Sequence, residues 1–252
     1  MIDYIYDGTF DGLLTCVYNH YYIDRAGGIY TGDSYQPNML WGSMTVETDE
    51  AKAAKVYDAI EEKISAYDLR GVYKAYLSSV PGKEMIILRY LVMGFRKGPA
   101  ISSLHGDPVV KDFQAILKKI SVEAERMLQF VRFSVMDGNI LYADIEPDHD
   151  VLELLHTHFC DRFRNDPFII HDVGRGKAMI AYQKHWYITD FDEDSVPRLS
   201  QEELSYRDLW KTFFDNIAIK ERANYRCQRN FMPERYRRHL TEITHPAQDR
   251  VL

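Results

Sequence analysis

The sequence is poor in cysteine. Its three cysteines, Cys16, Cys160 and Cys227, are odd in number and lie far apart among 252 residues. Such spacing argues against a disulfide framework, and the absence of a CxxC pair or a CxxxCxxC motif removes the usual ligands of a zinc or iron–sulfur site. We therefore expect reduced, structural cysteines and no metal ion in this chain.

Long hydrophobic runs are lacking as well. No stretch of about 18 consecutive apolar residues occurs, and the first residues hold no basic segment followed by an apolar run. From these absences we expect a cytoplasmic protein that neither enters a membrane nor carries an export signal.

The familiar catalytic motifs are missing too. GxSxG, HExxH, GxxxxGK[ST] and the paired-glycine dinucleotide fingerprint are all absent, which argues against the enzyme classes that those motifs mark. Acid–base chemistry by a few side chains stays open, with His171, Asp172, His158 and Asp7 as candidates. Because such neighbours arise by chance in any chain of this length, the residues alone do not decide whether the protein is an enzyme.

Histidine and carboxylate residues gather between positions 148 and 158. On a helix, His156 and His158 would project about 200° apart, so they cannot share one metal ion. His158 also falls on the apolar stripe of the predicted helix. This position favours a hydrogen-bonded core histidine over a metal ligand.

Charge is distributed unevenly along the chain. The whole sequence has a formal net charge of −7, yet residues 206–240 hold nine basic and four acidic residues, a local net charge of +5. The remainder holds 22 basic and 34 acidic residues, a net charge of −12. A basic segment inside an acidic chain indicates an anionic partner.

Aromatic residues interleave with the cations of this basic segment, since Tyr225, Phe231 and Tyr236 stand among arginines. Arginine neutralises phosphates and aromatic rings stack on exposed bases, so residues 222–240 are typical of single-strand or distorted-duplex binding. The glycine-rich tip of a predicted hairpin, "HDVGRGK", offers two further cations to a phosphate. The candidate nucleic-acid-binding residues are therefore Arg175, Lys177, Arg222, Arg226, Arg229, Arg235, Tyr236, Arg237 and Arg238.

Two plainer interpretations of the same residues stay open. Phe231 and Tyr236 can serve as anchors that hold the basic segment on the core. The glycines of the hairpin can simply close a turn, with Asp172 paired to a neighbouring cation.

Hydrophobic periodicity predicts the elements of the first half. A strand at residues 2–6 leads through Asp7-Gly8 to Thr9, a favourable N-cap for the helix that follows. Residues 24–43 are rich in glycine and turn formers and predict a surface loop. Helical spacing then dominates residues 49–128, with a break at Pro81-Gly82.

Between residues 129 and 190 the hydrophobic period changes from about 3.6 to 2. A hairpin with a three-residue loop at 137–139 places Val135 opposite Leu141, a helix follows Pro147, and a second hairpin turns at 174–176. The stretch "HWYI" adds one more strand. We therefore predict an α+β fold, mainly helical, with a small mostly antiparallel sheet built from a strand-strand-helix-strand-strand unit.

The expected organisation is a single globular unit, residues 1–252. It comprises an N-terminal strand and helical bundle (1–128), the antiparallel sheet unit (129–190) and basic C-terminal helices (200–245). Pro233 is expected to open a short helix at 234–240. The buried stripe of the first C-terminal helix is expected to comprise Tyr206, Trp210, Phe213, Phe214 and Ile217.

Four segments share their order and spacing with a known family. They are "YDGTFDGLLTCVY", "EAERMLQFVRF", "IEPDHDVLELLHTHFCDRF" with "PFIIHDVGRGKAMIAY", and "LWKTFFDNIAIKERANYRCQRNFMPERYRRHLTE". Together they resemble a bacterial family of unknown function that is described as a DNA metabolism protein and as the companion of a radical SAM protein of DNA modification or repair. The resemblance spans nearly the whole chain and is weak over residues 24–110.

The resemblance implies a partner of a radical SAM enzyme that acts on DNA. S-adenosylmethionine and the iron–sulfur cluster would belong to that enzyme, with no cofactor in this chain. Our leading hypothesis is a DNA-binding or adaptor subunit for DNA repair or modification, with single-stranded or damaged DNA as its ligand. The alternatives are a stand-alone nucleic-acid-processing enzyme of nuclease or glycosylase type, and a scaffold that binds only protein.

Overall fold

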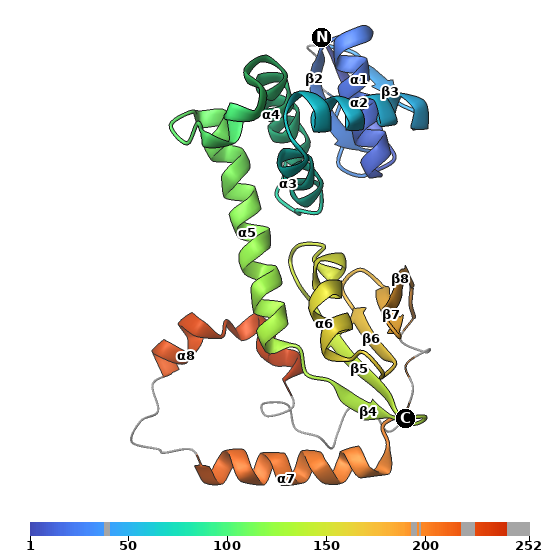
Figure 1. Cartoon of the computed structure of the whole chain (residues 1–252), viewed down its shortest axis with the longest axis vertical. Helices are drawn as coiled ribbons and strands as arrows, with labels where there is room; N and C mark the ends of the chain where they lie inside the picture. Colours follow the sequence, from blue (N-terminus) through green and yellow to red (C-terminus); the bar gives the residue numbers. More distant parts are fainter. Residues whose placement is uncertain (38–40, 193–195, 197, 218–224, 241–252) are drawn as a thin grey trace. The chain divides into compact units, whose positions relative to one another are not determined.

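A computed structural model of the chain describes residues 1–37, 41–192, 196, 198–217 and 225–240. The chain divides into two compact units, Met1–Ser121 and Val122–Leu252, each with a sheet of its own (Figure 1). Helices make up about 52% of the residues, which confirms a mixed and mainly helical fold. The expectation that the whole chain behaves as one globular unit stays a prediction.

The first unit is built on a three-stranded parallel sheet. Its central strand β1 (Ile2–Tyr6) pairs with β2 (Ala26–Thr31) on one side and with β3 (Ser43–Thr45) on the other. The crossover between β1 and β2 is α1 (Phe10–Tyr22), and such a connection makes the two strands parallel. Thr9 caps α1 as the sequence predicts.

Strand β2 corrects the expectation of a surface loop at residues 24–43. The two glycines that suggested a loop, Gly27 and Gly28, are strand residues here. A Cβ atom at Gly27 would lie 2.6 Å from Nε1 of Trp41, so this position needs glycine for close packing rather than for a turn. Glycine content alone does not separate these two uses.

Helices cover the rest of the first unit and enclose its core. The predicted break at Pro81-Gly82 is confirmed, because one helix ends at Tyr76 and the next begins at Lys83. Asp49 caps the helix that begins at Glu50. The bounds are α2 (Glu50–Lys63), α3 (Ala66–Tyr76), α4 (Lys83–Lys97), the 3₁₀ helix η1 (Gly98–Ser103) and α5 (Pro108–Phe130), of which residues from Val122 onward count with the second unit.

The second unit contains a five-stranded mixed sheet. Its strands, in spatial order, are β4 (Ser134–Met136), β5 (Ile140–Ile145), β6 (Phe168–Asp172), β7 (Lys177–Tyr182) and β8 (His185–Asp190). The first hairpin has the predicted register, with Val135 opposite Leu141, and the stretch "HWYI" does form a strand. Three of the four pairings are antiparallel, whereas β5 and β6 are parallel.

The parallel pairing follows from the connection between β5 and β6. This connection holds the 3₁₀ helix η2 (Leu152–Leu155) and α6 (His156–Arg162), and a crossover of that length returns the chain in the same direction. The expectation of a mostly antiparallel sheet is therefore partly correct for the mixed sheet of the second unit. It does not apply to the parallel sheet of the first unit. The strand-strand-helix-strand-strand order itself is confirmed.

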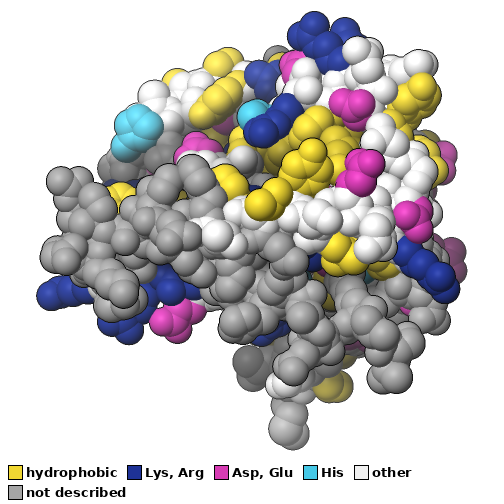
Figure 2. All heavy atoms as spheres, turned by 90° about the horizontal axis from the view of Figure 1, so that it is seen from below, with side chains coloured by type: hydrophobic (Ala, Val, Ile, Leu, Met, Phe, Trp, Pro, Cys, Tyr) yellow, Lys and Arg dark blue, Asp and Glu magenta, His cyan; other side chains and the backbone are white. Residues whose placement is uncertain are grey.

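The C-terminal helices are α7 (Gln201–Ile217), α8 (Tyr225–Phe231) and the 3₁₀ helix η5 (Glu234–His239), which Pro233 precedes as predicted. The predicted buried stripe of α7 is wrong at Tyr206 and Trp210, whose side chains are exposed. The side chains of Phe213, Phe214 and Ile217 lie outside the described part of α7. Figure 2 shows hydrophobic side chains at the surface on the face seen from below.

Within the described ranges, none of the helices combines the length and the apolar content that crossing a bilayer requires.

Candidate nucleic-acid interface

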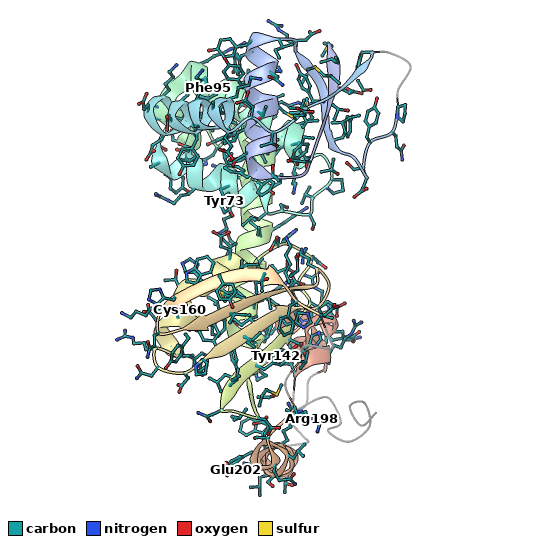
Figure 3. The ribbon with its side chains drawn as sticks, turned by 90° about the vertical axis from the view of Figure 1, so that its right-hand side faces the viewer. Tyr73, Phe95, Tyr142, Cys160, Arg198 and Glu202 are labelled. Atoms are coloured by element: carbon teal, nitrogen blue, oxygen red, sulfur yellow. The ribbon has the colours of Figure 1, made fainter. Side chains whose placement is uncertain are left out.

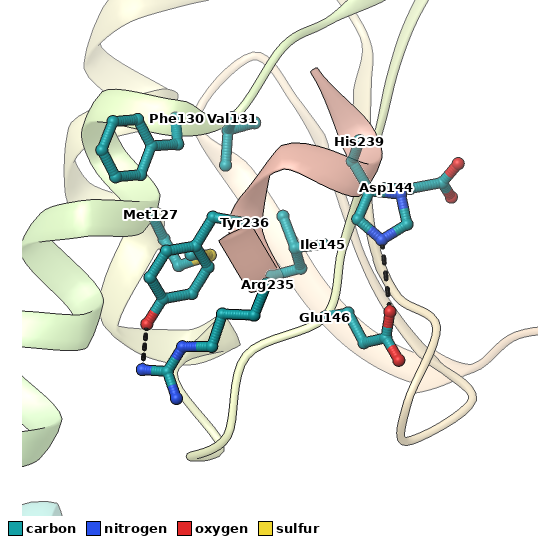
Figure 4. A pocket seen from close by; sticks show the side chains of 9 residues that line it. All are labelled: Met127, Phe130, Val131, Asp144, Ile145, Glu146, Arg235, Tyr236 and His239. Carbon is teal, nitrogen blue, oxygen red and sulfur yellow. Dashed lines mark hydrogen bonds and ion pairs between the residues drawn. The ribbon is translucent and has the colours of Figure 1, made fainter. Parts of the chain in front are cut away.

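The basic segment after Pro233 is docked on the second unit through one tyrosine. Tyr236 is 5% exposed, and its hydroxyl donates a hydrogen bond of 2.8 Å to Oε1 of Glu123 in α5. Its ring lies 5.9 Å from that of Phe130 (Figure 4). Leu240 is fully buried. Of the two interpretations of Tyr236, these contacts match the anchor rather than an exposed base-stacking ring.

Glu123 is the carboxylate on which this docking depends. Its side chain is 3% exposed, and its two oxygens accept hydrogen bonds from the N–H groups of Asp148 (3.0 Å) and His149 (2.7 Å). It therefore joins α5, the loop after β5 and η5. Sequence reasoning missed it, although a glutamate three residues after Ile120, on the buried face of α5, was the available signal.

Arg235 is held by the same group of residues. Its guanidinium forms ion pairs with the carboxylates of Asp148 and Glu123, donates to the hydroxyl of Tyr236 and lies 4.6 Å from the centre of that ring. The side chain remains 45% exposed. Arg235 is thus both a structural clamp and a cation that solvent can reach.

Arg175 occupies the tip of the second hairpin and also has several partners. Its Nη1 donates to Oδ2 of Asp172 (2.8 Å) and to the carbonyl of Pro147 (3.0 Å), while Nη2 donates to the carbonyl of Asp148 (2.7 Å). The structure therefore matches the alternative in which Asp172 pairs with a neighbouring cation, here Arg175. Arg175 fastens the hairpin to the loop after β5.

These arginines meet at a surface hollow of about 350 Å³, which we call the Gly174 hollow. Arg238 completes the set, and its Nη1 donates to Oε2 of Glu146 at 2.6 Å. His239 lies 3.5 Å from the same oxygen (Figure 4). The residues that line the Gly174 hollow are Glu146, Pro147, Asp148, Gly174, Arg175, Arg235 and Arg238.

The remaining candidate cations differ in their surroundings. Arg226 and Arg229 on α8 are exposed and have no carboxylate partner among the described residues. Phe231 at the end of α8 is 77% exposed, so it is not an anchor in this structure. Arg237 is half-buried and donates to the carbonyl of Met232.

Two other cations complete the candidate set. Lys177 is exposed at the start of β7, and its register partners in the sheet are Asp172 and Asp190. Arg222 lies outside the described residues. On the face shown in Figure 2, basic side chains stand beside acidic ones over the described surface rather than in one continuous basic field.

The catalytic candidates His171 and Asp172 are consecutive residues of β6, so their side chains point to opposite faces of the sheet. Asp172 is fully buried, and its Oδ1 has no hydrogen-bond partner among the described residues. Burial raises the pKa of Asp172 above its ordinary value, against the lowering effect of the Arg175 guanidinium. A carboxyl group with a raised pKa is one feature of an acid–base site.

His171 belongs to a buried polar cluster on the other face of the sheet. Tyr142 lies on β5 (Figure 3). Its hydroxyl donates to Oδ1 of Asp144 at 2.5 Å and lies 2.8 Å from Nδ1 of His171. Nδ1 of His171 also lies 3.3 Å from Oδ1 of Asp144, so the three side chains form one hydrogen-bonded network. This network is satisfied within the core.

The other two catalytic candidates do not join these residues. His158 is exposed on α6, which overturns its expected place on the apolar stripe, and its neighbour Phe159 takes the core position instead. Asp7 belongs to the first unit, where it accepts hydrogen bonds from Thr9 and Thr48. Burial raises the pKa of Asp7, but these hydrogen bonds outweigh it and hold the pKa below its ordinary value.

In the part of the chain that the structure describes, no three His, Cys, Asp or Glu side chains come together in a way that could hold a metal ion. The expectation that this chain binds no metal stays a prediction.

Comparison with known proteins gives a family and a weak structural likeness. A family model described as a domain of unknown function, DUF4130, matches residues 81–242, well over half of the chain. A solved structure of a pGpG-specific phosphodiesterase from Vibrio cholerae is similar at a TM-score of 0.34 and 9% sequence identity, covering 77% of this chain and 85% of that chain. That likeness is too slight to carry an argument. No curated protein matches the sequence.

Proposed function

The chain belongs to the DUF4130 family, whose function is unknown, and on that premise we propose that it is a DNA-binding or adaptor subunit in DNA repair or modification. Its partner would be a radical SAM enzyme, which would carry the S-adenosylmethionine and the iron–sulfur cluster. The sequence resemblance supports the choice of partner, and the charges of the second unit support the choice of ligand.

One observation carries the proposal of nucleic-acid binding. Arg226 and Arg229 stand three positions apart on α8, exposed and without a carboxylate partner among the described residues. The exposed ring of Phe231 ends the same helix. Cations spaced to follow a phosphate backbone, beside an aromatic ring on which a base can stack, are the two ingredients of single-strand binding.

The roles of the predicted site residues divide accordingly. Arg226, Arg229 and Arg238 would contact phosphates, and Phe231 would stack on a base. Tyr236 would serve as the anchor that keeps Arg235, Arg237 and Arg238 at the surface. In this division Arg175 and Arg235 shape the Gly174 hollow through their internal ion pairs, and Lys177 adds charge beside it.

The test replaces both exposed arginines of α8. We expect Arg226→Gln with Arg229→Gln to weaken binding of a single-stranded oligonucleotide by about tenfold and to reduce the slope of log K against log salt by about 1.4, because two phosphate contacts are lost. Fluorescence anisotropy at several salt concentrations measures both quantities.

Arg164→Gln is the matched control, because Arg164 is 64% exposed and lies elsewhere in the second unit. Equal effects of the α8 double variant and of this control would contradict the proposed interface. Co-expression with the radical SAM enzyme, followed by co-purification, tests the adaptor role separately.

A stand-alone enzyme is the second candidate, and the environment of Asp172 favours it. This carboxyl group is fully buried, has a raised pKa and lies behind the Gly174 hollow, where a Cβ at Gly174 would be 3.5 Å from Oδ1. Turnover of a modified oligonucleotide by the purified protein, abolished by Asp172→Asn but not by His158→Gln, would establish this alternative. Absence of any product would remove it.

A further inference from the structure

Two kinds of carboxylate surround the arginines of the Gly174 hollow. Asp172 and Glu123 are 0% and 3% exposed and hold Arg175 and Arg235, respectively. Glu146 and Asp148 are 37% and 54% exposed. A buried carboxylate that lost its arginine would be left without a partner away from water, so these two ion pairs are fixed.

The exposed pair is held far more loosely. The ion pair between Glu146 and Arg238 joins side chains that are 37% and 70% exposed. Pairs of this kind contribute little to stability, because water solvates both charges once they separate. Glu146 and Asp148 can therefore turn into solvent at little cost.

The two clamped arginines would keep their places if these carboxylates left. Arg235 would retain Glu123 and the hydroxyl of Tyr236. Arg175 would retain Asp172 and two main-chain carbonyl groups. Guanidinium groups that are already positioned lose less entropy when they bind an anion, which makes them favourable phosphate ligands.

We infer that the Gly174 hollow is a phosphate site for a nucleic-acid strand, in which the carboxylates of Glu146 and Asp148 occupy the place of the phosphate until the strand displaces them. This inference rests on the proposed DNA-binding function. A hollow of about 350 Å³ admits a phosphate with its sugar, and it lies within the size range of small-ligand sites. The displaced carboxylates set how strongly the strand is held.

The inference predicts that loss of an acidic residue strengthens binding through one particular arginine. We expect Glu146→Gln to raise the affinity for a short single-stranded oligonucleotide about fivefold, because Arg238 no longer has an internal partner to give up. Fluorescence anisotropy with the full-length protein measures the change. Asp148→Asn should act in the same direction through Arg235, and its main-chain contacts to Glu123 and Arg175 would remain.

Asp161→Asn is the control for general charge repulsion. Asp161 is 64% exposed and pairs with Arg164 in the same unit, so its loss removes the same charge away from the hollow. We expect a change of less than about twofold for this control. Thermal unfolding of each variant verifies that η5 remains docked.

A double variant tests whether the gain in affinity depends on the ion pair between Glu146 and Arg238. In the Arg238→Gln background, Glu146→Gln should no longer raise the affinity, since the ion pair that it frees is already absent. A gain that persists in this background, or an effect of Glu146→Gln equal to that of Asp161→Asn, would overturn the inference.

Failure of the inference can be told apart from failure of the proposed function. If the wild-type protein binds the oligonucleotide and the α8 double variant weakens binding, the DNA-binding function stands, and an inert Glu146→Gln overturns only the phosphate site. If the wild-type protein does not bind at low salt, both are overturned.

Discussion

Asp7 illustrates how one side chain can be misjudged from its type. It appeared as a catalytic candidate, but its carboxylate accepts hydrogen bonds from the N–H of Thr9 (3.0 Å), the hydroxyl of Thr9 (2.7 Å) and the hydroxyl of Thr48 (2.7 Å). A Cβ atom at Gly12 would lie 2.3 Å from Oδ1 of Asp7, so the glycine is part of the same arrangement. Asp7 organises the start of α1.

The lowered pKa of Asp7 gives a stability prediction with a definite sign. Its carboxylate stabilises the fold above the ordinary pKa, and this contribution is lost as the pH falls through the lower pKa of the folded state. We expect Asp7→Asn to reduce the free energy of unfolding by about 1 kcal/mol at neutral pH, with a smaller difference in strong acid. Urea unfolding across that pH range measures this.

Asp58→Asn provides the comparison for Asp7, because Asp58 is exposed on α2. A difference between wild type and Asp7→Asn that grows as the pH falls would contradict the assignment.

At the same scale, the sequence predicted the arginines around the Gly174 hollow but not the carboxylate of Glu123 that holds one of them. Arg175, Arg235 and Arg238 were predicted from local composition, and they do meet at one hollow. Glu123 was not predicted as their partner, because Tyr236 and Arg235 lie more than 100 positions later in the chain. Local patterns do not contain contacts of that separation.

At the scale of elements, α8 and η5 divide two tasks that the sequence had joined. Phe231 on α8 is exposed, whereas Tyr236 on η5 is buried, although both are aromatic residues among arginines. The pattern predicted a short helix after Pro233 correctly, because proline marks a helix start. It could not tell the two rings apart, since burial here depends on Glu123.

This division predicts that one substitution lowers stability and that another weakens oligonucleotide binding. We expect Tyr236→Phe to lower the free energy of unfolding by about 1 to 3 kcal/mol, because Glu123 loses a hydrogen-bond donor in a buried place. We expect Phe231→Ala to leave stability nearly unchanged and to weaken oligonucleotide binding by about 1 to 3 kcal/mol, the contribution of one stacked base. Chemical denaturation and anisotropy on both variants separate these effects.

A marked loss of stability in Phe231→Ala would contradict the exposed position of that ring. Unchanged stability in Tyr236→Phe would contradict the anchoring role of Tyr236.

Several elements were predictable, and the errors have physical causes. The helices of residues 49–128 and both hairpins follow from periodicity and turn residues, which are local. Strand β2 was missed because Gly27 serves close packing against Trp41. The stripe of α7 was misplaced because a hydrophobic spacing shows which side chains share a face, and not whether another element covers it.

At the scale of the whole molecule, the two units have separate sheets, and the proposed nucleic-acid contacts belong to the second unit alone. The described candidate nucleic-acid contacts all lie in the second unit, and Arg222 is outside the described residues. Ile60, in contrast, is fully buried in the core of the first unit. Removing part of the Ile60 side chain creates a cavity far along the sequence from these contacts.

We expect Ile60→Ala to reduce the free energy of unfolding of the first unit by about 2 to 5 kcal/mol, because a buried side chain is truncated. The oligonucleotide affinity, measured at a temperature at which the variant is folded, should not change. Calorimetry and anisotropy on the same preparation provide the two values. A parallel loss of affinity would mean that the first unit contributes to binding.

The hydrogen bond between Tyr236 and Glu123 also sets an order of events during synthesis, because the two residues are 113 positions apart. The ribosome delivers Glu123, Asp148 and His149 well before Tyr236, so this carboxylate can already bind the two N–H groups in the nascent chain. The arginines of α8 and η5 follow all three of these residues in the chain. Under the proposed DNA-binding function, a growing polypeptide would therefore acquire this framework before it presents the arginines of α8 and η5.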